Sequence, residues 1–101
     1  MPNLLSGTIS AASPKTVAVG TTSGEAVPAN NNRVGLIMSN LSTGTVYLGL
    51  SGLAATLNAG IVLLPSGGTT WSMDDYTYNK DQVNAIAHAA GATVAFQEFI
   101  T

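Results

Sequence analysis

The chain is 101 residues long, which is enough for one domain, and it contains no cysteine. The missing thiols exclude disulfides, cysteine-ligated zinc and thiol catalysis. Charged residues make up 8% of the sequence, and the net charge is −2, with Lys15, Arg33 and Lys80 as the cations. Three separated cations cannot form the basic stripe that binds nucleic-acid phosphates or anionic lipids, so we expect no nucleic-acid partner and no membrane partner.

The beginning of the chain carries no targeting signal. Residues 1–14 contain no positively charged side chain and no apolar run as long as that of a signal peptide. The longest apolar runs, such as residues 61–64, are far shorter than the ~20 residues needed to cross a bilayer. We therefore expect a soluble protein that is made in a cytoplasm.

Short apolar stretches alternate along the chain with clusters of Gly, Ser, Thr and Asn. This pattern is typical of an all-β sandwich or barrel. We predict a single β-sandwich domain, jelly-roll-like and with short strands, over residues 14–101, preceded by an extended N-terminal arm over residues 1–13. The first six predicted strands are 16–19, 25–27, 34–38, 46–50, 61–64 and 70–73.

The strand over residues 34–38 is apolar on both faces, which predicts a central position in a sheet. A turn is predicted at residues 40–44, after which the strand over residues 46–50 runs back. Alternation along the strand over residues 46–50 places Val46, Leu48 and Leu50 inside and Tyr47 and Gly49 outside. The positions predicted to be buried are Val17, Val19, Leu36, Met38, Val46, Leu48, Leu50, Leu63, Trp71, Val94 and Phe96.

Residues 81–91 fit two local structures. In a helix, Asp81 would be the N-cap, Gly91 would end the helix, and the apolar residues between them would share one face. In a strand over residues 83–89, the chain would turn near Gly91 into a final strand over residues 93–100. We favour the strand, because it forms a hairpin with that clear terminal strand.

Few residues could carry catalysis or bind a metal. His88 is the single histidine, and no serine lies in an elbow such as G-x-S-x-G, so we predict that the chain is not an enzyme. Asp74, Asp75 and Asp81 could offer oxygens to calcium, but their spacing matches no calcium loop and Lys80 lies among them. We expect a solvated loop there, and no metal or cofactor.

Trp71, Tyr76 and Tyr78 could form a platform on which a sugar stacks. The alternative, which we favour, is that Trp71 belongs to the core and the tyrosines cover its edge. Asn40-Leu41-Ser42 matches an N-glycosylation sequon, but such triplets are common by chance, and no secretory signal accompanies this one.

The run from Asn32 to Ser42 contains R-x-G-L-x-x-x-N-x-S, and V-Y-L-G follows at residues 46–49. Together with Leu64 to Thr69 and a closing segment that ends in Glu98-Phe99, these motifs resemble small virion proteins of tailed bacteriophages. Ser66 stands where that family more commonly has glycine. The resemblance covers residues 14–101 and implies a β-sandwich, often trimeric, that decorates or cements the capsid or is attached to other parts of the virion. It implies no catalytic residues.

The resemblance and the composition lead to one functional expectation. We expect a decoration protein on the capsid surface of a virion, which binds the major capsid protein and associates with itself, most simply as a homotrimer. Leu4, Leu5 and Ile9 are apolar residues in the polar N-terminal arm and are the candidate partner-binding residues. The alternatives are an adhesin that binds host-surface glycans and a structural component of the tail or neck.

Overall fold

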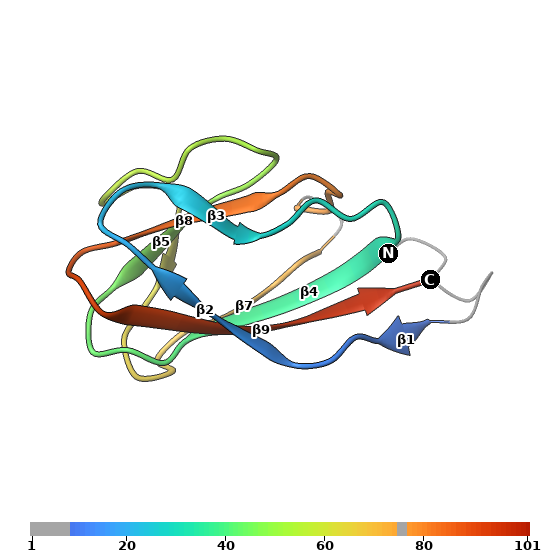
Figure 1. The fold of residues 1–101 in the computed structure, drawn as a ribbon, viewed down its shortest axis with the longest axis horizontal. Coiled ribbons are helices and arrows are strands. Elements are labelled where there is room, and N and C mark those ends of the chain that lie inside the picture. The colour runs from blue at the N-terminus through green and yellow to red at the C-terminus, as the bar shows by residue number, and fades with distance from the viewer. Residues whose placement is uncertain (1–8, 75–76) are drawn as a thin grey trace.

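The structure is a computed structural model that describes residues 9–74 and 77–101. These residues form strands and no helix, and the strands lie in two antiparallel sheets packed face to face (Figure 1). The predicted all-β sandwich is therefore confirmed. Within the described part of the chain, no helix is long and apolar enough to cross a membrane. The strands are β1 (Ser10–Ala11), β2 (Lys15–Val19), β3 (Gly24–Val27), β4 (Arg33–Asn40), β5 (Val46–Gly49), β6 (Ile61–Leu63), β7 (Thr70–Ser72), β8 (Val83–Ala87) and β9 (Ala92–Ile100).

The five-stranded sheet is built around β9 and β4, the two longest strands. β4 lies between β9 and β7, which confirms its predicted central position. β1 and β2 follow one another along the other edge of β9: Ser10 lies opposite Ile100, and Val19 lies opposite Ala92. Residues 10–11 of the predicted N-terminal arm thus extend this sheet.

The four-stranded sheet has the order β3-β8-β5-β6. The residues at 83–87 form strand β8, so the strand interpretation of this segment is confirmed and the helix is ruled out. Every residue of β8 is buried, because its inner face lies on the core and its outer face is covered by a loop. This explains why its sequence lacks the alternation of an exposed strand.

The predicted hairpin of residues 83–89 and 93–100 is wrong, although both strands are present. β8 and β9 lie in different sheets, so the turn near Gly91 connects one sheet to the other. The turn at residues 41–45 likewise connects the two sheets, because β4 belongs to the five-stranded sheet and β5 pairs with β6 and β8. A turn sequence marks where the chain reverses, but the pairing of the strands depends on residues distant in the sequence.

The core lies between the two sheets. Among the positions predicted to be buried, Val17, Leu50 and Trp71 are only half-buried and pack against the edge of the core. The other eight are buried, namely Val19, Leu36, Met38, Val46, Leu48, Leu63, Val94 and Phe96.

The loop between β5 and β6 covers the outer face of the four-stranded sheet. Tyr47 points outward from β5 as predicted, but it is only 7% exposed because it packs with Ala55 and Ile86 under this loop. Its hydroxyl donates to Oδ1 of Asn58 at 3.0 Å. Gly49 allows the loop between β5 and β6 to lie close against β5, since a Cβ at Gly49 would lie 2.5 Å from the carbonyl oxygen of Leu53.

Candidate functional site

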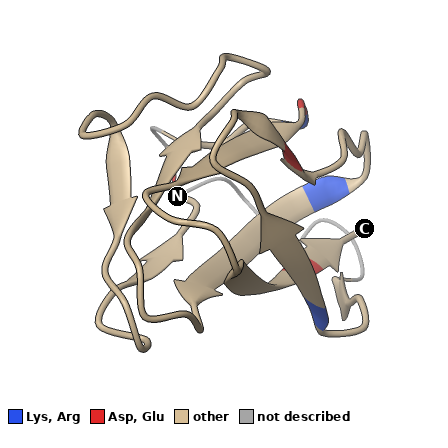
Figure 2. Cartoon of the chain, turned by 60° about the vertical axis from the view of Figure 1, so that its left-hand side comes forward, with Lys and Arg blue, Asp and Glu red and all other residues tan. Residues whose placement is uncertain are grey.

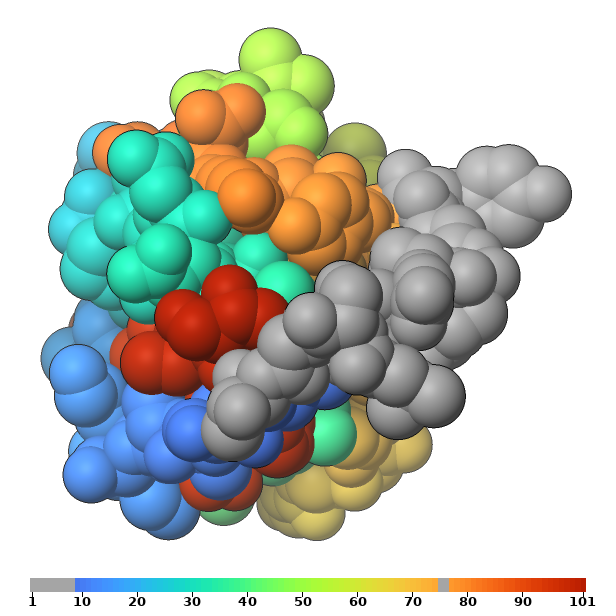
Figure 3. All heavy atoms as spheres, turned by 90° about the vertical axis from the view of Figure 1, so that its right-hand side faces the viewer, coloured from blue at the N-terminus to red at the C-terminus, as the bar shows by residue number. Residues whose placement is uncertain are grey.

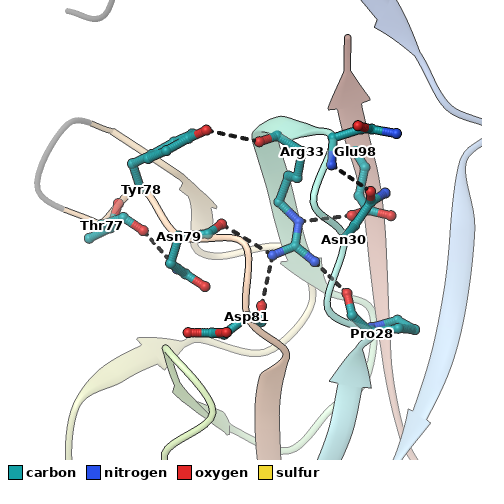
Figure 4. Close-up of polar contacts among 9 residues, drawn as sticks. Pro28, Asn30, Arg33, Thr77, Tyr78, Asn79, Asp81 and Glu98 are labelled. Atoms are coloured by element: carbon teal, nitrogen blue, oxygen red, sulfur yellow. Dashed lines mark hydrogen bonds and ion pairs between the residues drawn. The ribbon is translucent and has the colours of Figure 1, made fainter.

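Arg33 joins three segments of the chain at one end of the sandwich (Figure 4). Its side chain is fully buried at the start of β4. The guanidinium Nε donates to Oε2 of Glu98 at 2.8 Å. The terminal nitrogens donate to three backbone carbonyls, at 2.9 Å to Asp81, at 3.3 Å to Asn79, and to Pro28. A guanidinium has five N–H donors in a rigid fork, which suits it to connect several acceptors at once.

Backbone bonds reinforce the same junction. The N–H of Asn30 donates to the carbonyl of Lys80 at 2.8 Å, and the N–H of Thr101 donates to the carbonyl of Asn32 at 3.0 Å. The hydroxyl of Tyr78 donates to the carbonyl of Arg33 at 3.2 Å. The loop before β4, the segment before β8 and the end of β9 therefore pack side by side at this end (Figure 3).

This junction ties segments of the chain together through a paired buried charge. The positive charge of Arg33 is out of water, and it is matched by a Glu98 side chain that is 12% exposed. A buried charge is tolerated when it is paired and hydrogen-bonded in this way. The two remaining cations, Lys15 and Lys80, are exposed on the surface.

Asn40 has the corresponding position at the other end of β4. Its side chain is fully buried, and Nδ2 donates to the carbonyls of Gly44 at 2.7 Å and Leu63 at 2.9 Å. Its Oδ1 accepts the backbone N–H of Ser42 at 2.9 Å and the Ser42 hydroxyl. The amide nitrogen of the sequon is thus enclosed and engaged, so the folded chain cannot be glycosylated at Asn40.

The motif that resembles the virion proteins is made of structural residues. Arg33 and Asn40 hold the two ends of β4, and Leu36 is in the core. Gly35 lies under a ring on the neighbouring strand, because a Cβ there would come within 3.3 Å of the Cβ of Phe99. The sequence pattern alone does not reveal that Arg33 is buried, since arginines are usually exposed. The one feature of the sequence that could have indicated the burial of Arg33 is its position as a single arginine at the start of an apolar strand.

The aromatic residues proposed for sugar stacking are separated. Trp71 lies opposite Met38 and so points to the inner face, while the hydroxyl of Tyr78 reaches the carbonyl of Arg33. Arg33 and Met38 are five residues apart on β4, or roughly 17 Å along a strand. Tyr76 lies outside the described residues. Trp71 and Tyr78 therefore do not form one platform.

The acidic residues that the structure describes do not converge with the histidine on a metal site. Oδ1 of Asp74 accepts the N–H and the hydroxyl of Thr77, both at 3.0 Å, and Asp81 is exposed. Asp75 lies outside the described residues. Within the described ranges, no group of three or more His, Cys, Asp or Glu residues could hold a metal ion. His88 is exposed, and its backbone N–H donates to the carbonyl of Thr45 at 3.0 Å.

Of the candidate partner-binding residues, Leu4 and Leu5 lie outside the described residues. Ile9 is 38% exposed and lines a hollow beside Gly35 and Phe99. This hollow lies on the outer face of the five-stranded sheet, which we define as the outward-pointing residues of β2, β4, β7 and β9. Its members are Thr16, Ala18, Gly35, Ile37, Ser39, Thr70, Ser72, Thr93, Ala95, Gln97 and Phe99. None of these residues is charged.

Four short connections form the end of the sandwich that contains Asn40, which we call the turn end: residues 20–23, 41–45, 64–69 and 88–91. None of them contains Lys, Arg, Asp or Glu, and these connections come forward uncoloured in Figure 2. The N–H groups of Ser66 and Gly67 donate to the carbonyls of Ser42 and Asn40, at 2.8 and 2.7 Å, which ties two of the connections together. Leu41 and Leu64, on these two connections, are 54% and 49% exposed.

Comparisons with known proteins support the fold but assign no family. No protein-family model matches the chain, and no curated protein matches it. Among solved structures, it is similar to a chain from Bacillus endospore appendages, which are described as disulfide-linked pili. The two share 18% identity over 93% of this chain and 88% of that chain, with a TM-score of 0.51. At this identity the likeness shows the fold alone, and this chain has no cysteine with which to form such links.

Proposed function

We propose that this chain is a structural virion protein that decorates a bacteriophage capsid and stabilises it by binding the major capsid protein. The observation that carries the proposal is the turn end, which has no Lys, Arg, Asp or Glu, is held by the buried Asn40, and presents Leu41 and Leu64 to solvent. In β-sandwiches the loops at one end commonly form the binding surface on a rigid scaffold.

The chemistry of the turn end suits attachment to another protein. Few ions must lose their water when the turn end is covered, so its desolvation costs little. The exposed leucines contribute roughly 25 cal/mol for each Å² of apolar surface that the contact removes from water. Because an assembled shell presents many equivalent sites, binding of this chain would stabilise the shell by mass action.

The remaining parts of the proposal concern class and location. The polar side chains that are buried, Arg33, Asn40 and Asn84, are used to hold loops in place, which favours a structural role over catalysis. The similar Bacillus chain comes from pili, so a sandwich of this kind is compatible with a multi-subunit structure. We place the protein on the outer surface of the capsid, with self-association, expected as a trimer, as a second source of stability.

The test is binding of the purified chain to capsids that lack it, followed by co-sedimentation. We expect the chain to bind, and we expect Leu41→Asp and Leu64→Asp each to weaken binding at least tenfold. Leu53→Asp is the matched control, because Leu53 is 69% exposed and lies outside the turn end, on the loop between β5 and β6 that covers the four-stranded sheet. A native chain that does not bind capsids would overturn the proposal.

Copy number in purified particles separates decoration from the other virion roles. Hundreds of copies would support a decoration protein, whereas tens of copies or fewer would indicate the neck or the tail. Binding to a host polysaccharide instead of a capsid would favour the adhesin.

A further inference from the structure

The two sheets of the sandwich differ in how their outer faces are covered. On the four-stranded sheet, the loop between β5 and β6 buries Tyr47 and Ile86, which are 7% and 9% exposed. On the five-stranded sheet, Ile37 points outward from the middle of β4 and is 41% exposed. No described segment of the chain covers it in the way the loop covers Tyr47.

The outer face of the five-stranded sheet has a projecting residue between two hollows. Ile37 lines both of them. The larger hollow, about 430 Å³, has the small side chain of Ala95 at its base and Thr16 and Ser39 beside it. The smaller hollow, about 300 Å³, lies over Gly35 beside Phe99. Both hollows exist because alanine and glycine occupy positions where larger side chains would fill the sheet face.

We propose that a second copy of this chain docks on this face, so that the five-stranded sheets of two copies pack face to face. Each Ile37 enters the larger hollow of the other copy, beside Ala95. A contact between identical copies about a two-fold axis must be self-complementary, and a projection next to a hollow on the same face meets that requirement.

The charge distribution favours a second copy as the occupant. The outward-pointing residues of the face are uncharged, so two copies can meet there without like-charge repulsion, although each chain carries a net charge of −2. Lys15 lines the rim of the larger hollow, where solvent screens its charge. Charge at the rim with none at the centre is the usual anatomy of an interface between proteins.

The area of the face suits a weak, reversible pair. Its four strands hold 25 residues, with 5 in β2, 8 in β4, 3 in β7 and 9 in β9. With strands about 4.8 Å apart and about 3.4 Å per residue, these residues cover roughly 400 Å². Two such faces would bury roughly 800 Å², which is the size of a weak contact between proteins. This contact joins copies in pairs. If the chain also forms a trimer through a different surface, two trimers would be joined through this face into a particle of six chains.

Sedimentation of the purified chain tests this inference without any capsid, so its failure is distinguishable from failure of the proposed function. We expect a dimer or another even-numbered particle, and we expect Ile37→Asp to raise the dissociation constant of the pair at least tenfold. Val62→Asp is the matched control, because Val62 is 37% exposed on the outer side of the other sheet. A native monomer, a native trimer, or equal effects of the two variants would overturn the inference.

Cross-linking gives a second measurement that does not depend on the aspartate variant folding. Because the chain has no cysteine, Ile37→Cys and Ala95→Cys each introduce a single thiol. When the two variants are mixed and oxidised, we expect a covalent dimer that contains one chain of each kind. As the control, a mixture of Val62→Cys with Ala95→Cys should give no such dimer. Equal yields from the two mixtures would contradict the proposed contact.

Discussion

The two ends of β4 are held by different chemistry. At its start, Arg33 makes a buried ion pair with Glu98 and reaches three backbone carbonyls. At its end, Asn40 connects two carbonyls and a neighbouring serine without any charge. The first end is surrounded by segments that include the charged residues Lys80 and Asp81, while the turn end consists of short connections without Lys, Arg, Asp or Glu.

The difference shows how one strand can give a small sandwich two unlike ends. A buried ion pair can connect segments from distant parts of the chain, but it makes that end depend on a matched buried charge. A buried amide fixes short turns through neutral hydrogen bonds, each of which stabilises the fold by about 1 kcal/mol. The turn end is thereby held together without Lys, Arg, Asp or Glu, which suits the proposed contact with a shell.

Replacing the charge of Arg33 should produce the largest loss of stability. Arg33→Met removes the partner of Glu98 and leaves three carbonyls without their donor, so we expect a loss of roughly 3–5 kcal/mol, as for other broken buried ion pairs. Urea denaturation followed by circular dichroism measures this loss.

Glu98→Gln is the control for the charge at this end. Glutamine can keep an oxygen within reach of the Arg33 Nε, and the Arg33 bonds to the carbonyls remain. The loss should therefore be smaller than for Arg33→Met but still measurable, because the fully buried guanidinium loses its matching charge. If both variants had the stability of the native protein, the junction would not hold this end together.

Asn40→Ala should rank second. The substitution removes the donor to the carbonyls of Gly44 and Leu63 and the acceptor of the Ser42 N–H, and leaves the Gly44 carbonyl with only the Ser42 hydroxyl at 3.4 Å, so we expect a loss of roughly 2–3 kcal/mol. Ser42→Ala, which removes only a hydroxyl, should cost about 1 kcal/mol. The same denaturation experiment compares them, and a larger loss for Asn40→Ala than for Arg33→Met would reverse the order of the two ends.

The local pattern of the sequence was sufficient to predict the strands other than β1, which lies in the predicted N-terminal arm. Alternation in Val46 to Leu50 and the apolar run at residues 34–38 gave two strands and their inner residues, because side-chain direction in a strand follows directly from residue position. Leu50 is the exception, since β5 ends at Gly49 and Leu50 is half-buried. The same turn sequences could not show that β4 and β5 belong to different sheets. That assignment depends on contacts with β8 and β9, which lie far away in the sequence.

The buried polar residues could not be predicted for a different reason. Arg33 and Asn40 bond mainly to backbone carbonyls, and a carbonyl is present in every residue, so the partners leave no mark in the sequence. The sequence therefore identified Arg33 as a cation and Asn40 as part of a turn, a sequon and a family-like motif, but it did not indicate that either side chain is buried. Likewise, the cover over Tyr47 could be seen only once the loop between β5 and β6 was placed on the sheet.

The smallest effects are expected in the turn of residues 65–68, at the turn end. The N–H of Gly68 donates to the carbonyl of Pro65 at 3.0 Å, and Ser66 and Gly67 have φ angles of 57° and 73°. Two positive φ values are characteristic of a type I′ turn, in which glycine is favoured. Ser66→Gly should therefore change the stability by less than about 1 kcal/mol, with stabilisation the expected sign, because it relieves the left-handed conformation of a residue with a Cβ.

Gly67→Ala is the matched change in the opposite direction at the same turn. A Cβ at Gly67 would meet no atom within 4 Å, so the cost comes from the positive φ alone, and we expect a loss of about 1 kcal/mol. Thermal unfolding of both variants measures the pair, and the difference between them isolates backbone strain from packing. If Gly67→Ala were as damaging as Asn40→Ala, the rigidity of the turn end would depend on its backbone conformation as much as on the buried amide.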